Sequence, residues 1–424
     1  MTVIATMVDD SPALLAEKVA AQLKRPGYAM DPYFYRSHLV HERELDAIVY
    51  KSWLYAAHVS QVPEPGDYVQ FEIGEDAIII CRDESGEIHA LMNICRHRGA
   101  RVCEEKQGNR KTFVCPYHGW VYKLDGSLKA ARAMEALEGF DVANYGLKHA
   151  RCCVYEGLIF INCNPGAADF EPALDTVGVA LAPYELPSAR IAHSQVYRVE
   201  ANWKLALENY LECYHCATAH RAYAKMHSIQ DLDDRISDIT DNMLARAEQQ
   251  TGVPGITLDH YQAYSSSKDF GTDVYHSRYA LYDGFLTGSD GGQPVAPLMG
   301  QFKGYDGGAG DFQLGPLCFM LNYPDHCVLY RFTPRGITAT DMEIVWFVRG
   351  DAEEGRDYDR EAVTWLWHHT TLEDEYIITR NSAGVNSHFF EPGPYNPGYE
   401  SICTDFVAWY LNALDPLIRQ QEDA

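Results

Sequence analysis

The chain has 424 residues, of which 46% are apolar and 12% aromatic, and this composition excludes a disordered protein. A single hydrophobic core seldom grows to this length, so we expect two domains, or one domain with a large insert. The formal net charge of -25 argues against nucleic acids and anionic membrane surfaces as partners, because both would repel the chain.

The start of the chain and its cysteines indicate the compartment. The first ten residues lack the basic and apolar regions of a signal peptide, and no later run is apolar enough to span a membrane. We therefore expect a soluble, cytoplasmic protein. Twelve cysteines in a chain of this length do not indicate a disulfide scaffold, so we expect them to be buried thiols or metal ligands.

Apolar residues recur at helical spacing in two N-terminal segments, 13–23 and 41–53. Short β-like runs punctuated by Gly and Pro follow, at 67–73, 76–81, 88–94, 113–115 and 158–162. After residue 164 the pattern is mixed, with helices expected at 203–220 and 359–382 and strands at 192–199, 318–322, 327–333 and 341–348. A Gly- and Asp-rich stretch, 283–310, predicts a long loop. The sequence therefore predicts an α+β protein that contains a small all-β module.

Two Cys/His pairs, Cys95-Arg-His97 and Cys115-Pro-Tyr-His118, lie in the β-rich region with 17 residues between them. Each pair follows a short β-run, in a loop that contains glycine. Two thiolates and two imidazoles suit a Rieske [2Fe-2S] cluster, whose histidines raise the reduction potential to roughly -150 to +300 mV from about -400 mV. A zinc site uses the same ligand types but more often groups its histidines together, so the interleaved order favours the cluster.

A second set of ligands begins on the first helix expected after residue 164, where His215 and His220 are five residues apart. Two imidazoles and one distant carboxylate form a facial triad, which leaves positions on ferrous iron open to O2 and substrate. Among Glu373, Asp374 and Glu375 in the C-terminal helix, we select Asp374 as the third ligand. A spacing of five does not place two side chains on one helix face, so a distortion or an end of the helix must bring the histidines together.

Both motifs, in this order, resemble the α subunit of the Rieske non-haem iron oxygenases, which hydroxylate rings or demethylate amines, and the resemblance covers nearly the whole chain. It implies a Rieske domain inserted into a catalytic domain with a curved antiparallel sheet covered by helices, the helix-grip type. We accordingly expect a helical N-terminal part of the catalytic domain at 1–54, the Rieske domain at 55–164 and the catalytic iron domain at 165–424. The resemblance also implies a head-to-tail homotrimer.

The resemblance also implies roles for single residues. Glu212 resembles the carboxylate that bridges a cluster histidine of one subunit and an iron histidine of its neighbour, and Asn209 matches a position close to the iron, although a helix asparagine also often bonds to backbone. Ligation by Cys213 and Cys216 is disfavoured, because soft sulfur would alter the O2 chemistry. The implied cluster ligands are Cys95, His97, Cys115 and His118, and the implied ligands of mononuclear Fe(II) are His215, His220 and Asp374. The chain departs from the family at Thr379 and Ser382, where Glu and Gln are usual.

The run Glu-Cys-Tyr-His-Cys at 212–216 resembles the branch that oxidises glycine betaine, carnitine and stachydrine, whereas many ring dioxygenases have Asp at the first position. The leading hypothesis is therefore a monooxygenase that hydroxylates an N-methyl group of a small quaternary amine and releases formaldehyde. Aromatic faces suit such a cation, and 318–323 with Tyr330 is a candidate wall of the pocket, although ordinary strand packing explains the same residues and is the stronger interpretation.

Two other functions compete with this hypothesis. The first is the large subunit of an aromatic-ring-hydroxylating dioxygenase that acts on an aromatic acid. The second is a non-catalytic Rieske electron carrier, for which the first motif would suffice; the length of the chain and the second pair of histidines argue against it. No Gly-x-Gly-x-x-Gly run lies between a strand and a helix, so electrons must come from a separate reductase that carries flavin and an iron–sulfur centre.

Overall fold

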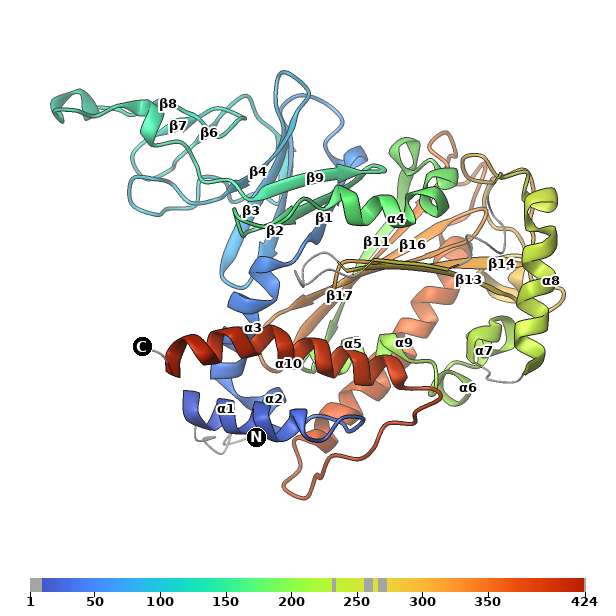
Figure 1. The fold of residues 1–424 in the computed structure, drawn as a ribbon. Coiled ribbons are helices and arrows are strands. Elements are labelled where there is room, and N and C mark those ends of the chain that lie inside the picture. The colour runs from blue at the N-terminus through green and yellow to red at the C-terminus, as the bar shows by residue number, and fades with distance from the viewer. Residues whose placement is uncertain (1–9, 231–233, 255–261, 266–272, 423–424) are drawn as a thin grey trace.

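The computed structural model describes residues 10–230, 234–254, 262–265 and 273–422. Figure 1 shows a small β module at one end of the molecule and a larger domain in which helices cover a wide sheet. In the described residues the strands form four sheets, three of them in the module and one, of seven strands, in the larger domain. The predicted α+β class is confirmed. The first nine residues, on which the expectation of no signal peptide rests, lie outside the described residues.

The β module is antiparallel and begins and ends in the same sheet. That sheet has the order β1-β10-β9, with β1 Leu54–His58, β10 Leu158–Asn162 and β9 Arg151–Tyr155. The second sheet has the order β4-β3-β2-β5, with β4 Ile88–Met92, β3 Asp76–Arg82, β2 Asp67–Ile73 and β5 Gln107–Asn109. The third has the order β6-β7-β8, with β6 Phe113–Val114, β7 Val121–Tyr122 and β8 Leu128–Ala130. Because its two ends pair side by side, the module has the geometry of an insert.

The large sheet is antiparallel and is buried on both faces. Its order is β11-β17-β16-β15-β14-β13-β12, with β11 Arg190–Val199, β17 Thr340–Val348, β16 Cys327–Pro334, β15 Cys318–Asn322, β14 Gly308–Leu314, β13 Val274–Ala280 and β12 Gln262–Ser265. Along β15, Phe319 and Leu321 pack in one core, whereas Cys318 and Met320 pack in another. Successive side chains of a strand therefore point to opposite faces of the sheet.

Different helices cover the two faces of this sheet (Figure 1). The face that includes Leu321 is covered by α5 (Trp203–Leu211) and α9 (Arg360–Val385), and the other face by α4 (Glu171–Leu181) and α8 (Asp234–Thr251). The short helices α6 (Cys216–Ala219) and α7 (Arg221–Met226) continue from α5 and contact α9. None of the helices in the described ranges is long and apolar enough to cross a membrane.

The N-terminal helices pack on the C-terminal helix, far from them in sequence. They are α1 (Pro12–Leu23), α2 (Tyr33–Arg36) and α3 (His38–Ala47), and α1 and α3 contact α10 (Ser401–Glu422). Glu44 of α3 accepts hydrogen bonds from Trp203 Nε1 at 2.8 Å and from Tyr410 Oη at 2.6 Å, and it forms an ion pair with Lys204. Glu44 and Lys204 are almost fully buried, and the contacts of Glu44 join α3 to α5 and to α10.

Two helices differ from the sequence prediction, and the strands β13 and β14 were not predicted. The single helix expected over 203–220 is wrong, because α5 ends at Leu211, Glu212 is extended (φ -118°, ψ 151°) and α6 starts at Cys216. The helix expected over 41–53 ends at Ala47 and is followed by a single 3-10 turn, Val49–Lys51. The long loop was predicted correctly, since its regular structure before β14 is limited to one turn, Asp290–Gly292.

The buried pair between Glu44 and Lys204 allows a test of this packing. Glu44→Ala should lower the free energy of unfolding by about 3–5 kcal/mol, because it leaves the Lys204 ammonium buried without a partner. The combined replacement of Glu44 by Leu and Lys204 by Met removes both charges and should restore most of the loss. Chemical denaturation of the three proteins measures this. Equal losses in the single and double variants would contradict the ion-pair account.

Candidate metal centres

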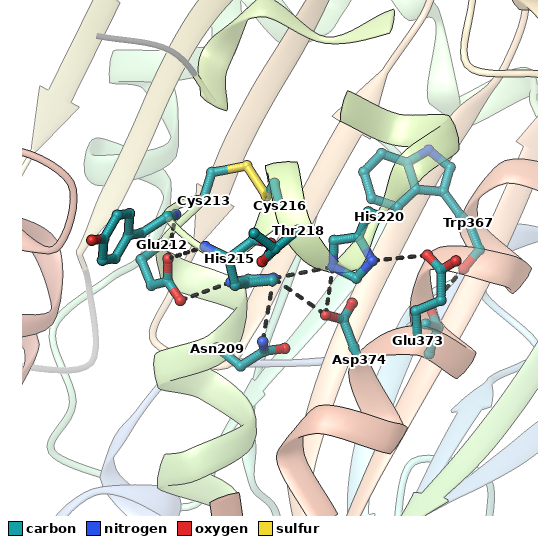
Figure 2. A network of polar contacts seen from close by, with 12 residues as sticks. Asn209, Glu212, Cys213, His215, Cys216, Thr218, His220, Trp367, Glu373 and Asp374 are labelled. Atoms are coloured by element: carbon teal, nitrogen blue, oxygen red, sulfur yellow. Dashed lines mark hydrogen bonds and ion pairs between the residues drawn. A yellow bond between two sulfur atoms is a disulfide. The ribbon is translucent and has the colours of Figure 1, made fainter. Parts of the chain in front are cut away.

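The break between α5 and α6 brings three ligand atoms together. His215 precedes the first residue of α6, His220 follows its last residue, and Asp374 lies in the middle of α9. The two Nε2 atoms are 3.1 Å apart, and Asp374 Oδ1 lies 2.9 Å from Nε2 of His220 and 3.4 Å from Nε2 of His215 (Figure 2). The predicted distortion of the helix is therefore what joins these side chains.

The other nitrogen of each imidazole faces a carboxylate. Nδ1 of His215 lies 2.7 Å from Oε1 of Glu212, and Nδ1 of His220 lies 2.9 Å from Oε2 of Glu373 (Figure 2). A carboxylate accepts, so each ring donates from Nδ1 and keeps the lone pair of Nε2 free for a metal, as carboxylate–histidine–metal arrangements require. Glu373, which the sequence offered only as a rival third ligand, instead orients His220.

The two Nε2 atoms and Asp374 Oδ1 are arranged to bind a cation. Asp374 Oδ1 is buried and makes no hydrogen bond of normal geometry, although both imidazoles lie close to it. Lone pairs and a carboxylate at such distances repel unless a positive charge lies among them. Two imidazoles and one carboxylate are the set that holds non-haem Fe(II) with open positions, so His215, His220 and Asp374 would hold that ion.

Protons compete with a metal for this site. Burial lowers the pKa of His215, but the nearby carboxylates of Asp374 and Glu212 outweigh burial and raise it to about 9. For His220 the pKa is likewise raised, mainly by Asp374 against the effect of burial. Burial raises the pKa of Asp374, and the imidazoles of His215 and His220 beside it reverse this effect and lower it. A metal that binds here must displace protons from the imidazoles.

Cys213 and Cys216, on either side of His215, are joined by a disulfide (Figure 2). The expectation that the cysteines are thiols or metal ligands is wrong for this pair. A disulfide offers no thiolate, so neither sulfur competes with His215 for iron. The cross-link closes the turn that connects α5 to α6.

Asn209 also faces the site. Its Nδ2 lies 3.3 Å from Nε2 of His215, and its side chain comes from the last turns of α5 (Figure 2). The amide thus contacts the nitrogen assigned to the metal and not a backbone group. Its predicted influence on the metal stays a prediction, now supported by position.

The other predicted ligands lie in two loops with the same backbone pattern. In each loop the cysteine N–H, of Cys95 or Cys115, donates to the carbonyl five residues later at 2.8 Å. A glycine N–H then donates back to the cysteine carbonyl at 3.0 Å, from Gly99 in one loop and Gly119 in the other. Both glycines have positive φ, 80° and 72°, which other residues adopt only with strain. Two matching loops thus face one another across one site.

Within this site the sulfurs are buried and the imidazoles are exposed. Cys95 and Cys115 are 3% and 2% exposed, whereas His97 and His118 lie at the surface with ring centroids 4.6 Å apart. The Tyr122 hydroxyl lies 3.2 Å from the Cys95 sulfur. Buried thiolates with a polar contact and outward imidazoles fit a Rieske cluster, whose potential such contacts tune and whose histidines face an electron acceptor.

A cavity of about 220 Å³ adjoins His215, His220 and Asp374. Its walls include five aromatic side chains, those of Tyr210, Tyr223, Tyr279, Trp367 and Tyr399. The candidate wall is largely wrong: from the segment 318–323 only Leu321 lines the cavity, and Tyr330 does not. Tyr210 on α5 and Tyr223 on α7 lie next to the histidine motif in the sequence, on either side of it. This proximity is the signal that could have predicted them as cavity residues.

Comparison with known proteins agrees with both sites. The family profile described as "Ring hydroxylating alpha subunit (catalytic domain)" matches residues 186–415, and that of the "Rieske [2Fe-2S] domain" matches residues 52–145. The chain belongs to the ring-hydroxylating oxygenase α-subunit family. This Rieske non-haem iron oxygenase therefore carries a [2Fe-2S] cluster and a mononuclear iron, as predicted, while the individual ligands stay assignments from geometry.

Two relatives match nearly end to end. The glycine betaine monooxygenase oxygenase subunit of Chromohalobacter salexigens is 32% identical over 98% of this chain and 93% of its own. That of Pseudomonas aeruginosa PAO1 is 31% identical over 97% of this chain and 95% of its own. The solved quaternary ammonium Rieske monooxygenase CntA in complex with L-carnitine has a TM-score of 0.67 at 20% identity, and covers 97% of this chain and 99% of its own. At that identity the structure confirms the fold alone.

Replacements in the acidic run of α9 test the ligand assignment. Asp374→Ala should remove the mononuclear iron and leave the visible spectrum of the cluster unchanged, because the two sites share no residue. Glu373→Gln should weaken iron binding by about 10–100-fold, because it alters the group that orients His220. Glu375→Gln is the matched control and should bind iron normally. Iron and sulfide assays with absorption spectra measure all three, and loss of iron in the control would contradict the choice of Asp374.

Proposed function

We propose that this protein is the oxygenase component of a monooxygenase that N-demethylates a small quaternary ammonium compound, such as glycine betaine, carnitine or stachydrine. The observation that carries the proposal is the aromatic cavity beside the three converging ligands. Two relatives that match along most of their length are glycine betaine monooxygenase oxygenase subunits, which supports the same substrate class.

The lining of the cavity suits a cation that cannot form hydrogen bonds. A quaternary ammonium group has no N–H, so it is held by aromatic faces, at about 0.5–2 kcal/mol for each contact. Tyr223 and Trp367 pack edge to face, with ring centroids 5.6 Å apart, and Tyr210 lies across from them on α5. Within the described residues, no Lys or Arg lines this cavity, so an ammonium group meets no fixed positive side chain there.

The proposed reaction uses one O2, two electrons and two protons. One oxygen atom enters a C–H bond of an N-methyl group, and the other leaves as water. The N-hydroxymethyl product then breaks its C–N bond, releasing formaldehyde, a proton and the amine with one methyl group fewer. Bound iron would supply the activation of O2, whereas the chain itself holds the imidazoles through Glu212 and Glu373 and offers the methyl group a cavity with aromatic side chains.

Electron delivery in this proposal involves a neighbouring subunit. Figure 1 shows strands β6–β8, next to the cluster loops, at the far end of the molecule from α6. The exposed imidazoles of His97 and His118 can face another chain, and the Glu212 carboxylate beside His215 is 14% exposed. A head-to-tail homotrimer would bring these groups together. The electrons themselves come from a separate reductase with flavin and iron–sulfur centres.

A second function, the large subunit of an aromatic-ring dioxygenase, has two observations in its favour. The anthranilate 1,2-dioxygenase large subunit of Acinetobacter baylyi is 38% identical, but over only 43% of this chain and 40% of its own. Naphthalene 1,2-dioxygenase from Rhodococcus sp. shares the fold, with a TM-score of 0.64. The matches along the full chain and the glutamate at position 212 favour the amine.

Substrate turnover distinguishes these two functions. The holoenzyme with a suitable reductase should release one formaldehyde for each O2 consumed when given one or more of glycine betaine, carnitine and stachydrine. Colorimetric detection of formaldehyde, with an oxygen electrode, measures the ratio. Hydroxylation of benzoate or anthranilate in the same assay, with no formaldehyde from any amine, would establish the dioxygenase instead.

The proposed route of the electrons gives a second test. Glu212→Gln should keep both metals but lower formaldehyde formation by about tenfold or more, because a neutral amide holds the proton of His215 less strongly than a carboxylate does. Glu212→Asp, which keeps the charge, should retain more activity. Stopped-flow oxidation of the reduced cluster in the presence of O2 and substrate separates slow transfer from lost iron. A cluster reoxidised at the normal rate in Glu212→Gln would contradict the bridging role.

A further inference from the structure

One carboxylate lines the aromatic cavity and has no part in holding the iron ligands. It belongs to Asp311, in the middle of β14, and its cross-strand neighbour on β15 is Leu321, which lines the same cavity. Phe312 and Leu314 on the same strand pack in the core on the opposite face of the sheet. The strand therefore presents Asp311 toward the helices that carry His215 and Asp374.

The Asp311 carboxylate lacks a cationic partner in the described part of the chain. Its hydrogen bond comes from the backbone N–H of Phe312, and His276 bonds to the Asp311 carbonyl and not to the carboxylate. Burial raises the pKa of Asp311 to about 7. Two fully buried acids elsewhere are paired with a cation: Asp306 with Arg278, and Glu44 with Lys204. Asp311 is half-buried in the cavity wall, and no fixed positive charge in the described residues compensates its carboxylate.

The surroundings of Asp311 are aromatic. Burial and then the negative charge of Asp311 raise the pKa of Tyr210, so its hydroxyl stays neutral, and this hydroxyl is buried without a hydrogen-bond partner. The pKa values of Tyr223 and Tyr279 are also raised, by burial first and partly by Asp311. Three rings and one acid therefore enclose the same space, which is the environment that a bulky cation requires.

We propose that Asp311 is the counter-ion of the substrate's ammonium group, and that it selects a trialkylammonium compound over the neutral compound of the same shape. Aromatic faces already favour a trimethylammonium group over a tert-butyl group, by about 0.5–2 kcal/mol for each contact, and the Asp311 carboxylate adds a Coulombic preference of its own. A neutral ligand would cover the half-buried Asp311 carboxylate and leave it unpaired, whereas a cation compensates it. The inference rests on the proposed function, since it concerns the same cavity.

Two matched ligand pairs isolate the charge. Choline is compared with 3,3-dimethylbutan-1-ol, and glycine betaine with 3,3-dimethylbutanoate; in each pair carbon replaces nitrogen and the shape is kept. Binding to the iron-loaded holoenzyme is measured by calorimetry without O2, so that turnover is not needed. The wild-type protein should bind the ammonium member of at least one pair at least about 30-fold more tightly than its carbon isostere.

Asp311→Asn should reduce that ratio by about tenfold by weakening mainly the charged member, and the aromatic rings supply the preference that is left. Asp311→Ser should do the same if the amide disturbs the fold. Iron content and the cluster spectrum should be unchanged in both variants. Gln313→Asn is the matched control, because Gln313 lies two residues along the same face of β14 but outside this cavity, and it should keep the ratio. A ratio near one in the unchanged protein, or equal weakening of both members by Asp311→Asn, would overturn the inference.

The same measurements separate this inference from the proposed function. If charge preference is present and is lost in Asp311→Asn, but no amine yields formaldehyde, the demethylation proposal fails and the role of Asp311 stands. If formaldehyde is released but the ratio survives in Asp311→Asn, the demethylation proposal stands and the counter-ion fails.

Discussion

Two imidazole nitrogens and one carboxylate oxygen are held within 3.4 Å of one another, and this convergence constrains much of the catalytic domain. Electron-rich atoms do not gather at such distances without a positive charge among them. The chain enforces the arrangement from two directions. Glu212 holds His215 after the end of α5, and Glu373 on the long helix α9 holds His220 beside Asp374. A helix break and a rigid helix are both needed, because neither element alone presents three ligands.

The position of the break depends on packing far from the metal site. α5 starts at Trp203, where the side chain of Asn202 caps the helix by accepting from the N–H of Lys204. The same turn is fixed by Glu44, which joins α5 to α3 and α10. Since α5 has nine residues, its buried first turn sets the position of its last turn, from which Asn209 and the chain to His215 extend. The N-terminal and C-terminal helices thus position the metal ligands without contacting them.

Local and long-range information explain what the sequence could predict. The cluster ligands were predictable because each Cys/His pair lies in one short loop, whose glycine and backbone bonds are encoded within six residues. The continuous helix was wrong because helical spacing of apolar residues continues past Leu211. Its end depends on the Glu212 side chain, which accepts from the backbone N–H groups of Tyr214 and His215 and bonds to the imidazole as well. Helix propensity does not predict where a side chain such as that of Glu212 replaces helical hydrogen bonds and ends the helix.

Other features required distances between remote segments. Glu373 is 153 residues from His220, and only the fold shows that it, and not its neighbour, faces Nδ1. The strands β13 and β14 lacked a pattern strong enough to predict, since their residues alternate between a core face and a cavity face that carries Asp311 and tyrosines. Polar and aromatic residues at such positions break the apolar pattern that identifies a buried strand. The residues that line the cavity therefore make these strands difficult to recognise from the sequence.

The carboxylates around the cavity have different uses because different groups lie opposite them. Glu212 and Glu373 accept hydrogen bonds from the Nδ1–H groups of the two imidazoles, so each has a partner within the chain. Asp374 faces two lone pairs, so its charge is balanced by a metal. Asp311 faces aromatic rings, which offer a cation their electron-rich faces but do not themselves balance a negative charge. When iron neutralises Asp374, the Asp311 carboxylate remains in the cavity, and the ligand becomes its natural source of positive charge.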